Sequence, residues 1–179
     1  MTTALLHLNC VAAESSTGRR HWVARRKIDP GTVIAFFSGE IVNTQEMLRR
    51  VRRGNGNVDD PLQISRDFYI LLDEDSQLFS HSCEPNAGVR GVNTLFALSE
   101  IDEGEVVSLD FSTVVGVSLF DQIWEMNCNC GTATCRRFLK SVLSLPRETL
   151  KRYAIMGALP DFIMTDLIST ESSPLTYKK

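Results

Sequence analysis

The chain has 179 residues, a formal net charge of −3 and a hydrophobic content of 43%. This length and composition predict one folded domain with its own core rather than a disordered segment. The slightly negative charge disfavours a protein that binds nucleic acid directly through its overall field. The sequence also lacks the roughly 20 consecutive apolar residues of a membrane helix, so we expect no membrane partner.

The amino-terminal run MTTALLHLNC has no basic start, and His7 and Asn9 interrupt it, which disfavours a signal peptide. We therefore expect an intracellular protein, cytoplasmic or nuclear, whose cysteines are thiols or metal ligands rather than disulfides. Two basic runs, at residues 19–27 and 49–53, are compatible with solvated surface and with docking of an acidic partner.

Short strands are predicted wherever apolar and β-branched residues run between turn-forming residues. A turn at residues 29–32 (DPGT) has a clear mechanism, because proline presets φ and glycine accepts a positive φ. The predicted strands cover residues 5–13, 22–28, 33–37, 67–72, 93–98 and 104–111.

Helices are predicted in two places. Residues 43–53 suit a short helix, because Asn43 or Thr44 can cap its start and Met47 and Val51 share one face. The run GNGNVDDP after it predicts a loop, and residues 145–168 predict one or two short helices broken by glycine and proline. Many short strands with few helices predict an α+β, mostly β domain rather than a βαβ fold.

Three of the five cysteines form the tight pattern CNCGTATC, with sulfurs at Cys128, Cys130 and Cys135. Structural zinc takes four such soft ligands in a tetrahedron. A Cys-x-Cys pair must curl to aim both sulfurs at one ion, and Asn129 and Gly131 permit this curl. The alternative is a set of separate buried thiols; the tight spacing favours zinc.

A fourth zinc ligand must come from elsewhere in the chain. Cys83 lies in the polar loop HSCEPN and is the best candidate, whereas His81 is a weaker one. Cys10 lies in an apolar run and is expected to pack as a small hydrophobe. Taken alone, the HSCEPN loop is equally compatible with a plain turn, because serine, asparagine and proline favour bent backbone.

These segments resemble, in order, the motifs of SET-domain methyltransferases. HSCEPN resembles the family's asparagine-histidine-serine-cysteine-x-proline-asparagine signature, and CNCGTATCRRF resembles its post-SET zinc tail. Residues 19–42 resemble the first SET motif, and residues 97–111 resemble a strand-turn-strand unit that ends in phenylalanine-aspartate-tyrosine. The matches cover about residues 5–140.

The resemblance implies a SET-domain fold of small β-sheets with a knot-like crossing, in which the strand that ends at Asp110 passes beneath the HSCEPN loop. It implies three parts: a SET domain at residues 1–120, a post-SET zinc-binding segment at 121–140 and a short helical tail at 141–179. It also implies one structural zinc ion, held by Cys83, Cys128, Cys130 and Cys135.

The resemblance further implies methyl transfer from S-adenosylmethionine to a lysine of a protein or peptide. In the family, the cofactor lies between the first motif and the signature loop. By position, the residues expected to bind it are Arg19, Arg20, His21, Tyr69, Ser80 and His81, with Phe138 or Leu139 packing on the adenine.

The catalytic region departs from the family pattern. Phe111 stands at the position of the catalytic tyrosine, Leu109 replaces an aromatic residue of the lysine channel, and Arg19 and His21 replace glycines. Phe111 is then either the altered catalytic position or a packing residue, with Tyr69 or Tyr153 as candidates to supply a phenol. Asp110 is expected to be a turn partner rather than a base.

These departures leave two alternatives to a protein-lysine methyltransferase open. One is an enzyme that uses S-adenosylmethionine on a small molecule or an unusual nucleophile. The other is a catalytically impaired SET module that binds partners.

Overall fold

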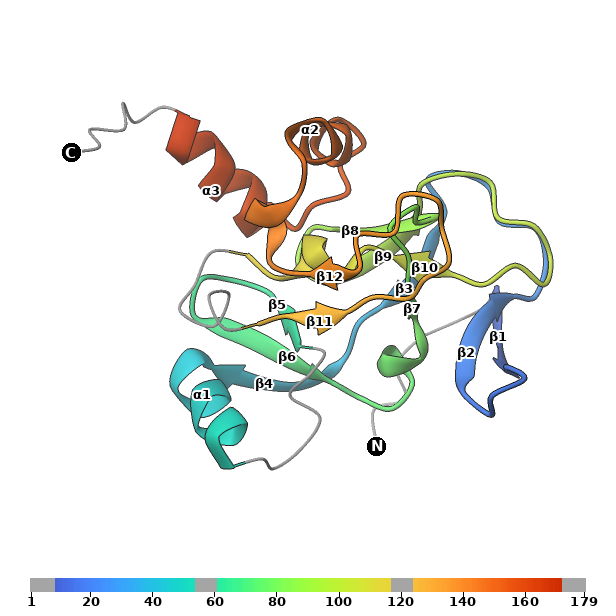
Figure 1. The fold of residues 1–179 in the computed structure, drawn as a ribbon, viewed down its shortest axis with the longest axis horizontal. Coiled ribbons are helices and arrows are strands. Elements are labelled where there is room, and N and C mark those ends of the chain that lie inside the picture. Colours follow the sequence, from blue (N-terminus) through green and yellow to red (C-terminus); the bar gives the residue numbers. More distant parts are fainter. Residues whose placement is uncertain (1–8, 54–60, 117–123, 172–179) are drawn as a thin grey trace.

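The structure is a computed structural model, and it describes residues 9–53, 61–116 and 124–171 (Figure 1). Within these ranges the strands form five small sheets rather than one continuous sheet. The elements in chain order are β1 (Cys10–Glu14), β2 (Arg20–Ala24), β3 (Val33–Phe36), β4 (Gly39–Asn43), α1 (Thr44–Arg53), β5 (Pro61–Gln63), β6 (Phe68–Leu72), η1 (Ser76–Leu78), β7 (Ser80–His81), β8 (Ala87–Arg90), β9 (Thr94–Ala97), β10 (Ser108–Leu109), η2 (Phe111–Val114), β11 (Met126–Asn127), β12 (Phe138–Leu139), η4 (Val142–Ser144), α2 (Arg147–Ile155) and α3 (Asp161–Glu171).

The sheets are mostly antiparallel. Strands β1 and β2 form a hairpin, β9 lies between β3 and β8, and β6 lies between β4 and β5. Strands β11 and β12 pair antiparallel, whereas β10 lies parallel to β7. This assembly of small sheets with two carboxyl-terminal helices confirms the mostly β fold class.

Helix α1 forms as the sequence predicts. The Asn43 side-chain oxygen accepts a hydrogen bond from the Glu46 amide at 2.9 Å, which satisfies one of the free donors at the helix start. Met47 is fully buried against the sheet that contains β4 and β6. The predicted loop that follows lies almost entirely outside the described residues, at 54–60.

The HSCEPN loop and the segment around β10 are held against each other. The Ser82 amide donates to the Leu109 carbonyl at 3.0 Å. The buried Asn86 side chain accepts from the Ser108 amide and donates to the Val106 carbonyl, both at 2.9 Å. The Asn86 side chain thus makes hydrogen bonds that a neighbouring strand would otherwise make, and it holds the segment around β10 against the HSCEPN loop.

The prediction of one strand over residues 104–111 is wrong in its extent. Only Ser108 and Leu109 form a strand, and Val106 forms an isolated bridge with Val23. The chain then turns into η2 because the Asp110 carboxylate accepts the Ser112 amide and caps that turn. The sequence reasoning also missed strands β4, β5, β7, β8, β11 and β12.

The carboxyl-terminal helices belong to the packed core. Phe96 on β9 lies in one buried cluster with Val142, Tyr153 and Ile163. Figure 1 shows α2 and α3 on the side of the molecule opposite α1, with α2 near β8. Within the described ranges, no helix is long and apolar enough to cross a membrane.

The contact between β8 and the segment after α2 is so close that it requires glycine. A Cβ atom on Gly88 would lie 2.8 Å from the Cβ of Ala158 and 3.0 Å from a methyl group of Leu98. Real Cβ atoms do not approach other atoms so closely, so the backbone would have to shift.

We therefore predict that Gly88→Ala lowers the free energy of unfolding by about 1–3 kcal/mol, the usual cost of overpacking a core. Urea denaturation measures the change. The double variant Gly88→Ala with Ala158→Gly should recover part of the loss, because it removes the opposing methyl group. Equal stability of wild type and Gly88→Ala would show that the helices do not pack as described.

Candidate functional site

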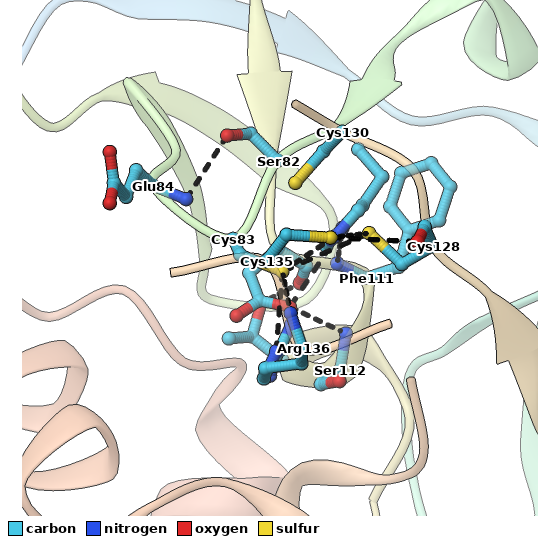
Figure 2. A network of polar contacts seen from close by, with 12 residues as sticks. Ser82, Cys83, Glu84, Phe111, Ser112, Cys128, Cys130, Cys135 and Arg136 are labelled. Carbon is cyan, nitrogen blue, oxygen red and sulfur yellow. Dashed lines mark hydrogen bonds and ion pairs between the residues drawn. The ribbon is translucent and has the colours of Figure 1, made fainter. Parts of the chain in front are cut away.

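Four cysteine side chains approach one another between the HSCEPN loop and the segment that follows β11 (Figure 2). The Sγ atom of Cys128 lies 3.9 Å from that of Cys83 and 3.7 Å from that of Cys135. The sulfurs of Cys83, Cys128 and Cys130 and a ring nitrogen of His81 all lie within 4.8 Å of one another. We call the four cysteine sulfurs the sulfur cluster.

The spacing of these sulfurs fits a metal site. Four sulfurs at about 2.3 Å from a zinc ion lie about 3.8 Å apart along the edges of a tetrahedron. The two measured separations, 3.7 and 3.9 Å, match this edge and are far longer than a disulfide bond of about 2.05 Å. Sulfur atoms at these two separations fit a zinc site that includes Cys128.

The backbone of residues 128–135 makes the curl that the spacing requires. Gly131 adopts a positive φ of 79°, which a residue with a side chain adopts only with strain. The Cys135 amide donates to the Thr132 carbonyl at 3.2 Å, and the Cys128 amide donates to the Arg137 carbonyl at 2.8 Å. These hydrogen bonds bring Cys135 back next to Cys128.

His81 is placed as a hydrogen-bond partner of the sulfur cluster. Its Nδ1 atom accepts from the Phe111 amide at 3.2 Å, so in the neutral ring the proton is on Nε2. Nε2 lies 3.4 Å from the Cys83 sulfur and donates towards it. Burial lowers the pKa of His81 to about 4, against the opposing charge of Asp110, so the ring is neutral at pH 7. The atoms within 4.8 Å of one another thus include His81 and not Cys135, and the donation from Nε2 to the Cys83 sulfur is the reason to keep the four cysteines as the predicted ligand set.

The thiols of the cluster differ in acidity. Burial raises the pKa of Cys128 to about 12. Burial also opposes ionisation of Cys130, but hydrogen bonds led by that from the Thr132 hydroxyl lower its pKa to about 6. Because a metal binds thiolates, metal binding to the cluster releases protons. The affinity for the metal therefore decreases as the pH falls.

Asp110 is a structural anchor, as expected from the sequence. Its carboxylate accepts from the Ser112 amide at 3.0 Å, from the Tyr153 hydroxyl at 3.1 Å and from the Arg136 guanidinium. The side chain of Asp110 is 1% exposed and that of Arg136 is 19% exposed, so this ion pair is largely dry. Both oxygens of this carboxylate accept hydrogen bonds, which fits a structural role.

Arg136 also contacts the sulfur cluster. Its backbone amide and its Nε atom each donate to the Cys83 sulfur at 3.4 Å. Sequence reasoning missed both Arg136 and the role of Tyr153. Nothing in the run CRRF distinguishes Arg136 from Arg137, which is exposed.

A polar groove of about 430 Å³ lies next to the cluster, within the usual size of ligand sites. It brings together Arg19, His21, Ser80 and His81, four of the residues predicted to bind the cofactor, and also Phe111. The complete lining is Ser15, Thr17, Arg19, His21, Ser80, His81, Val106, Phe111, Met126, Asn127, Cys128, Asn129 and Cys130.

The other residues predicted to bind the cofactor do not line this groove, and Leu139, the alternative to Phe138, is buried in the core. Arg20 is exposed on β2, and Phe138 is 63% exposed on β12, where it pairs with Asn127. Tyr69 is 0% exposed in a core cluster with Met47 and Trp124. A cofactor role for these residues, and a catalytic role for Tyr69, stay predictions.

A narrow apolar pocket of about 30 Å³ adjoins Phe111 as well. Phe111 thus lines both cavities, and Leu109 lines the apolar pocket. Among the described residues, no tyrosine lines either cavity. The lining of the apolar pocket is Phe37, Pro61, Leu62, Leu72, Ser76, Gln77, Phe79, Leu109, Phe111, Val114, Val115 and Trp124.

This chain is similar to known proteins both in sequence and in fold. The sequence is 27% identical over 127 residues to human Histone-lysine N-methyltransferase 2B, an alignment that covers 64% of this chain and 4% of that protein. The fold matches the methyltransferase domain of human Histone-lysine N-methyltransferase SETMAR with a TM-score of 0.53 and 19% identity. That match covers 71% of this chain and 55% of the solved chain. No family model matches the sequence.

The chain has a SET-domain fold and is related to the histone-lysine methyltransferases. In SET-domain terms, the sulfur cluster is consistent with a post-SET zinc site, and the polar groove lies between the first motif and the signature loop. The chain spans only a small part of the first relative and about half of the second.

We predict that the purified protein contains one zinc ion per chain and that Cys135→Ser or Cys130→Ser releases it, since each removes a sulfur from the tetrahedron. His81→Gln should keep the metal, because His81 donates to a ligand instead of being one. Elemental analysis of each folded variant gives the metal content.

Cys10→Ser is the matched control for these variants. Cys10 is buried in a different core cluster, so its loss should not change the metal content. A wild-type protein without metal would contradict the predicted zinc site. Full metal in Cys135→Ser together with loss in His81→Gln would exchange Cys135 for His81 in the ligand set.

Proposed function

We propose that this chain is an S-adenosylmethionine-dependent methyltransferase that acts on a lysine side chain of a protein or peptide. In this proposal the polar groove binds the cofactor through Arg19, His21, Ser80 and His81. The apolar pocket, which shares Phe111 with the groove, receives the end of the lysine side chain. The small-molecule alternative places a different nucleophile in the same pocket.

The observation that carries this proposal is the position of Phe111 in the walls of both cavities. Methyl transfer is an in-line displacement, so the acceptor must approach the methyl group from the side opposite to the sulfur that leaves. Two cavities that share Phe111 in their walls place the proposed donor and acceptor sites next to each other, and such a displacement needs no general acid-base pair. The buried Asp110, whose oxygens both accept hydrogen bonds, agrees with such a mechanism.

The apolar pocket suits the deprotonation that a lysine acceptor needs. S-adenosylmethionine supplies an activated methyl group, but the lysine amine must be neutral, which costs about 4.6 kcal/mol at pH 7. None of the described residues that line the pocket is charged. Removal of water from the amine in this pocket disfavours its charged form and lowers its pKa.

The proposed zinc ion has a structural role. Cys83, Cys128, Cys130 and Cys135 would hold it in a closed tetrahedron with no open position for a reactant. We further propose the division into a SET domain at residues 1–120, a zinc-binding segment at 121–140 and a helical tail at 141–179. Packing of the tail against β9 supports a tail that folds together with the SET domain.

A second candidate function is a SET module that binds partners without methyl transfer. The lack of a tyrosine among the described residues of both cavity walls favours it, because a phenol hydroxyl is then missing where the amine and the methyl group would meet. Calorimetry and a transfer assay with labelled cofactor separate the two candidates.

We predict that the zinc-loaded protein binds S-adenosylmethionine in calorimetry and transfers label slowly to lysine-containing peptides. Phe111→Tyr should raise the transfer rate about fivefold, since a hydroxyl here adds one hydrogen bond worth about 1 kcal/mol to the aligned amine. Phe36→Tyr is the matched control, because Phe36 is half-exposed on β3 and lines neither cavity.

The outcomes of this assay are distinct. Absence of cofactor binding would contradict the proposed methyltransferase and would favour the SET module that binds partners. Cofactor consumption without label on peptide would point to the small-molecule alternative. A Phe111→Tyr rate equal to or below that of wild type would contradict the placement of Phe111.

A further inference from the structure

The sulfur cluster and the wall of the polar groove are connected by a closed circuit of hydrogen bonds. The Phe111 amide donates to His81 Nδ1, and His81 Nε2 donates towards the Cys83 sulfur. Arg136 donates to the same sulfur from its amide and its Nε atom. The guanidinium of Arg136 also pairs with Asp110, the residue before Phe111. Figure 2 shows Cys83, Phe111 and Arg136 within this network.

Arg136 is the side chain in this circuit that joins two negative groups. A zinc ion with four thiolates carries a net charge of −2, so the Cys83 sulfur becomes a strong hydrogen-bond acceptor when metal binds. The other end of the guanidinium neutralises a carboxylate that is 1% exposed. The planar guanidinium can contact both groups at once, which a lysine ammonium cannot do in the same way.

The Asp110 carboxylate, which Arg136 contacts, helps to fix the backbone that carries Phe111 in the groove wall. Asp110 caps η2, which begins at Phe111, and it also accepts from Tyr153 on α2. Phe111 and His81 both line the polar groove. Cys128 and Cys130 line the groove themselves, and a change at Cys83 reaches Phe111 by two routes, through His81 and through Arg136 with Asp110.

We propose that Arg136 is a positioning residue that couples metal binding at the sulfur cluster to the groove wall at Phe111 and His81. Zinc and S-adenosylmethionine then strengthen each other's binding. The inference rests on the proposed function, because it takes S-adenosylmethionine as the ligand of the groove. Linkage requires that the cofactor raise the affinity for zinc by the same factor by which zinc raises the affinity for the cofactor.

Arg137 provides a control with the same side-chain chemistry, while its backbone has a positive φ of 67° and its carbonyl accepts from the Cys128 amide. Its side chain is exposed, whereas that of Arg136 reaches a sulfur and a carboxylate. Arg136→Gln and Arg137→Gln remove the same charge from adjacent positions. Any difference between the two variants therefore reports the contacts of Arg136.

The test measures zinc affinity by competition with a chelator, with and without saturating S-adenosylmethionine. Cofactor binding to zinc-loaded wild type is established first by calorimetry. In wild type and Arg137→Gln, the cofactor should raise the affinity for zinc about tenfold, within the usual range of coupling. In Arg136→Gln this factor should fall to about three, because the route through His81 remains. The factor is a ratio within one variant, so a general loss of stability does not lower it.

An unchanged factor in Arg136→Gln would overturn the coupling and leave the proposed function standing. Failure of zinc-loaded wild type to bind the cofactor would overturn both. If Arg136→Gln does not fold, Arg136→Lys replaces it, since lysine keeps the charge but cannot bridge sulfur and carboxylate. The Lys variant should also lose part of the coupling, and a wild-type factor there would equally overturn the proposal.

Discussion

The Cys83 sulfur is the point at which distant parts of this chain meet. It lies 3.9 Å from the Cys128 sulfur and accepts from the amide and side chain of Arg136, residues that follow it by 45 and 53 positions. Small sheets with short strands are only marginally stable alone, so they do not hold these distant segments together by themselves. The loop, the tail and the groove wall therefore depend on what holds these sulfurs together.

The other contacts around the site act in the same direction. Asn86 holds the segment before Asp110 along the HSCEPN loop, and Asp110 then joins Arg136 of the tail to Tyr153 of α2. The Thr134 hydroxyl donates to Glu84 at 2.8 Å and gives the tail a second link to the loop. The groove and the apolar pocket thus share Phe111 in a region where the loop, the tail and α2 are tied to one carboxylate and one sulfur. A methyl donor and an amine must be aligned closely, and a rigid junction of this kind suits that task.

Sequence patterns predicted the features that depend on neighbouring residues. The cap at Asn43 and the curl at Gly131 follow from local chemistry, and the cysteine spacing predicted the convergence of sulfurs. Features set by distant contacts were missed. The strand predicted over residues 104–111 ends early because Asp110 caps η2 and is held there by residues of the tail and α2. Tyr69 and Ile70 are both buried on β6, so alternation along that strand carries no signal for the direction of either side chain.

X-ray absorption at the zinc edge of the purified protein tests the central claim most directly, because it reports the kind, number and distance of the atoms around the metal. The account predicts four sulfur neighbours at about 2.3 Å and no shell of nitrogen or oxygen. A spectrum with nitrogen at about 2.0 Å, or a protein without zinc, would contradict it.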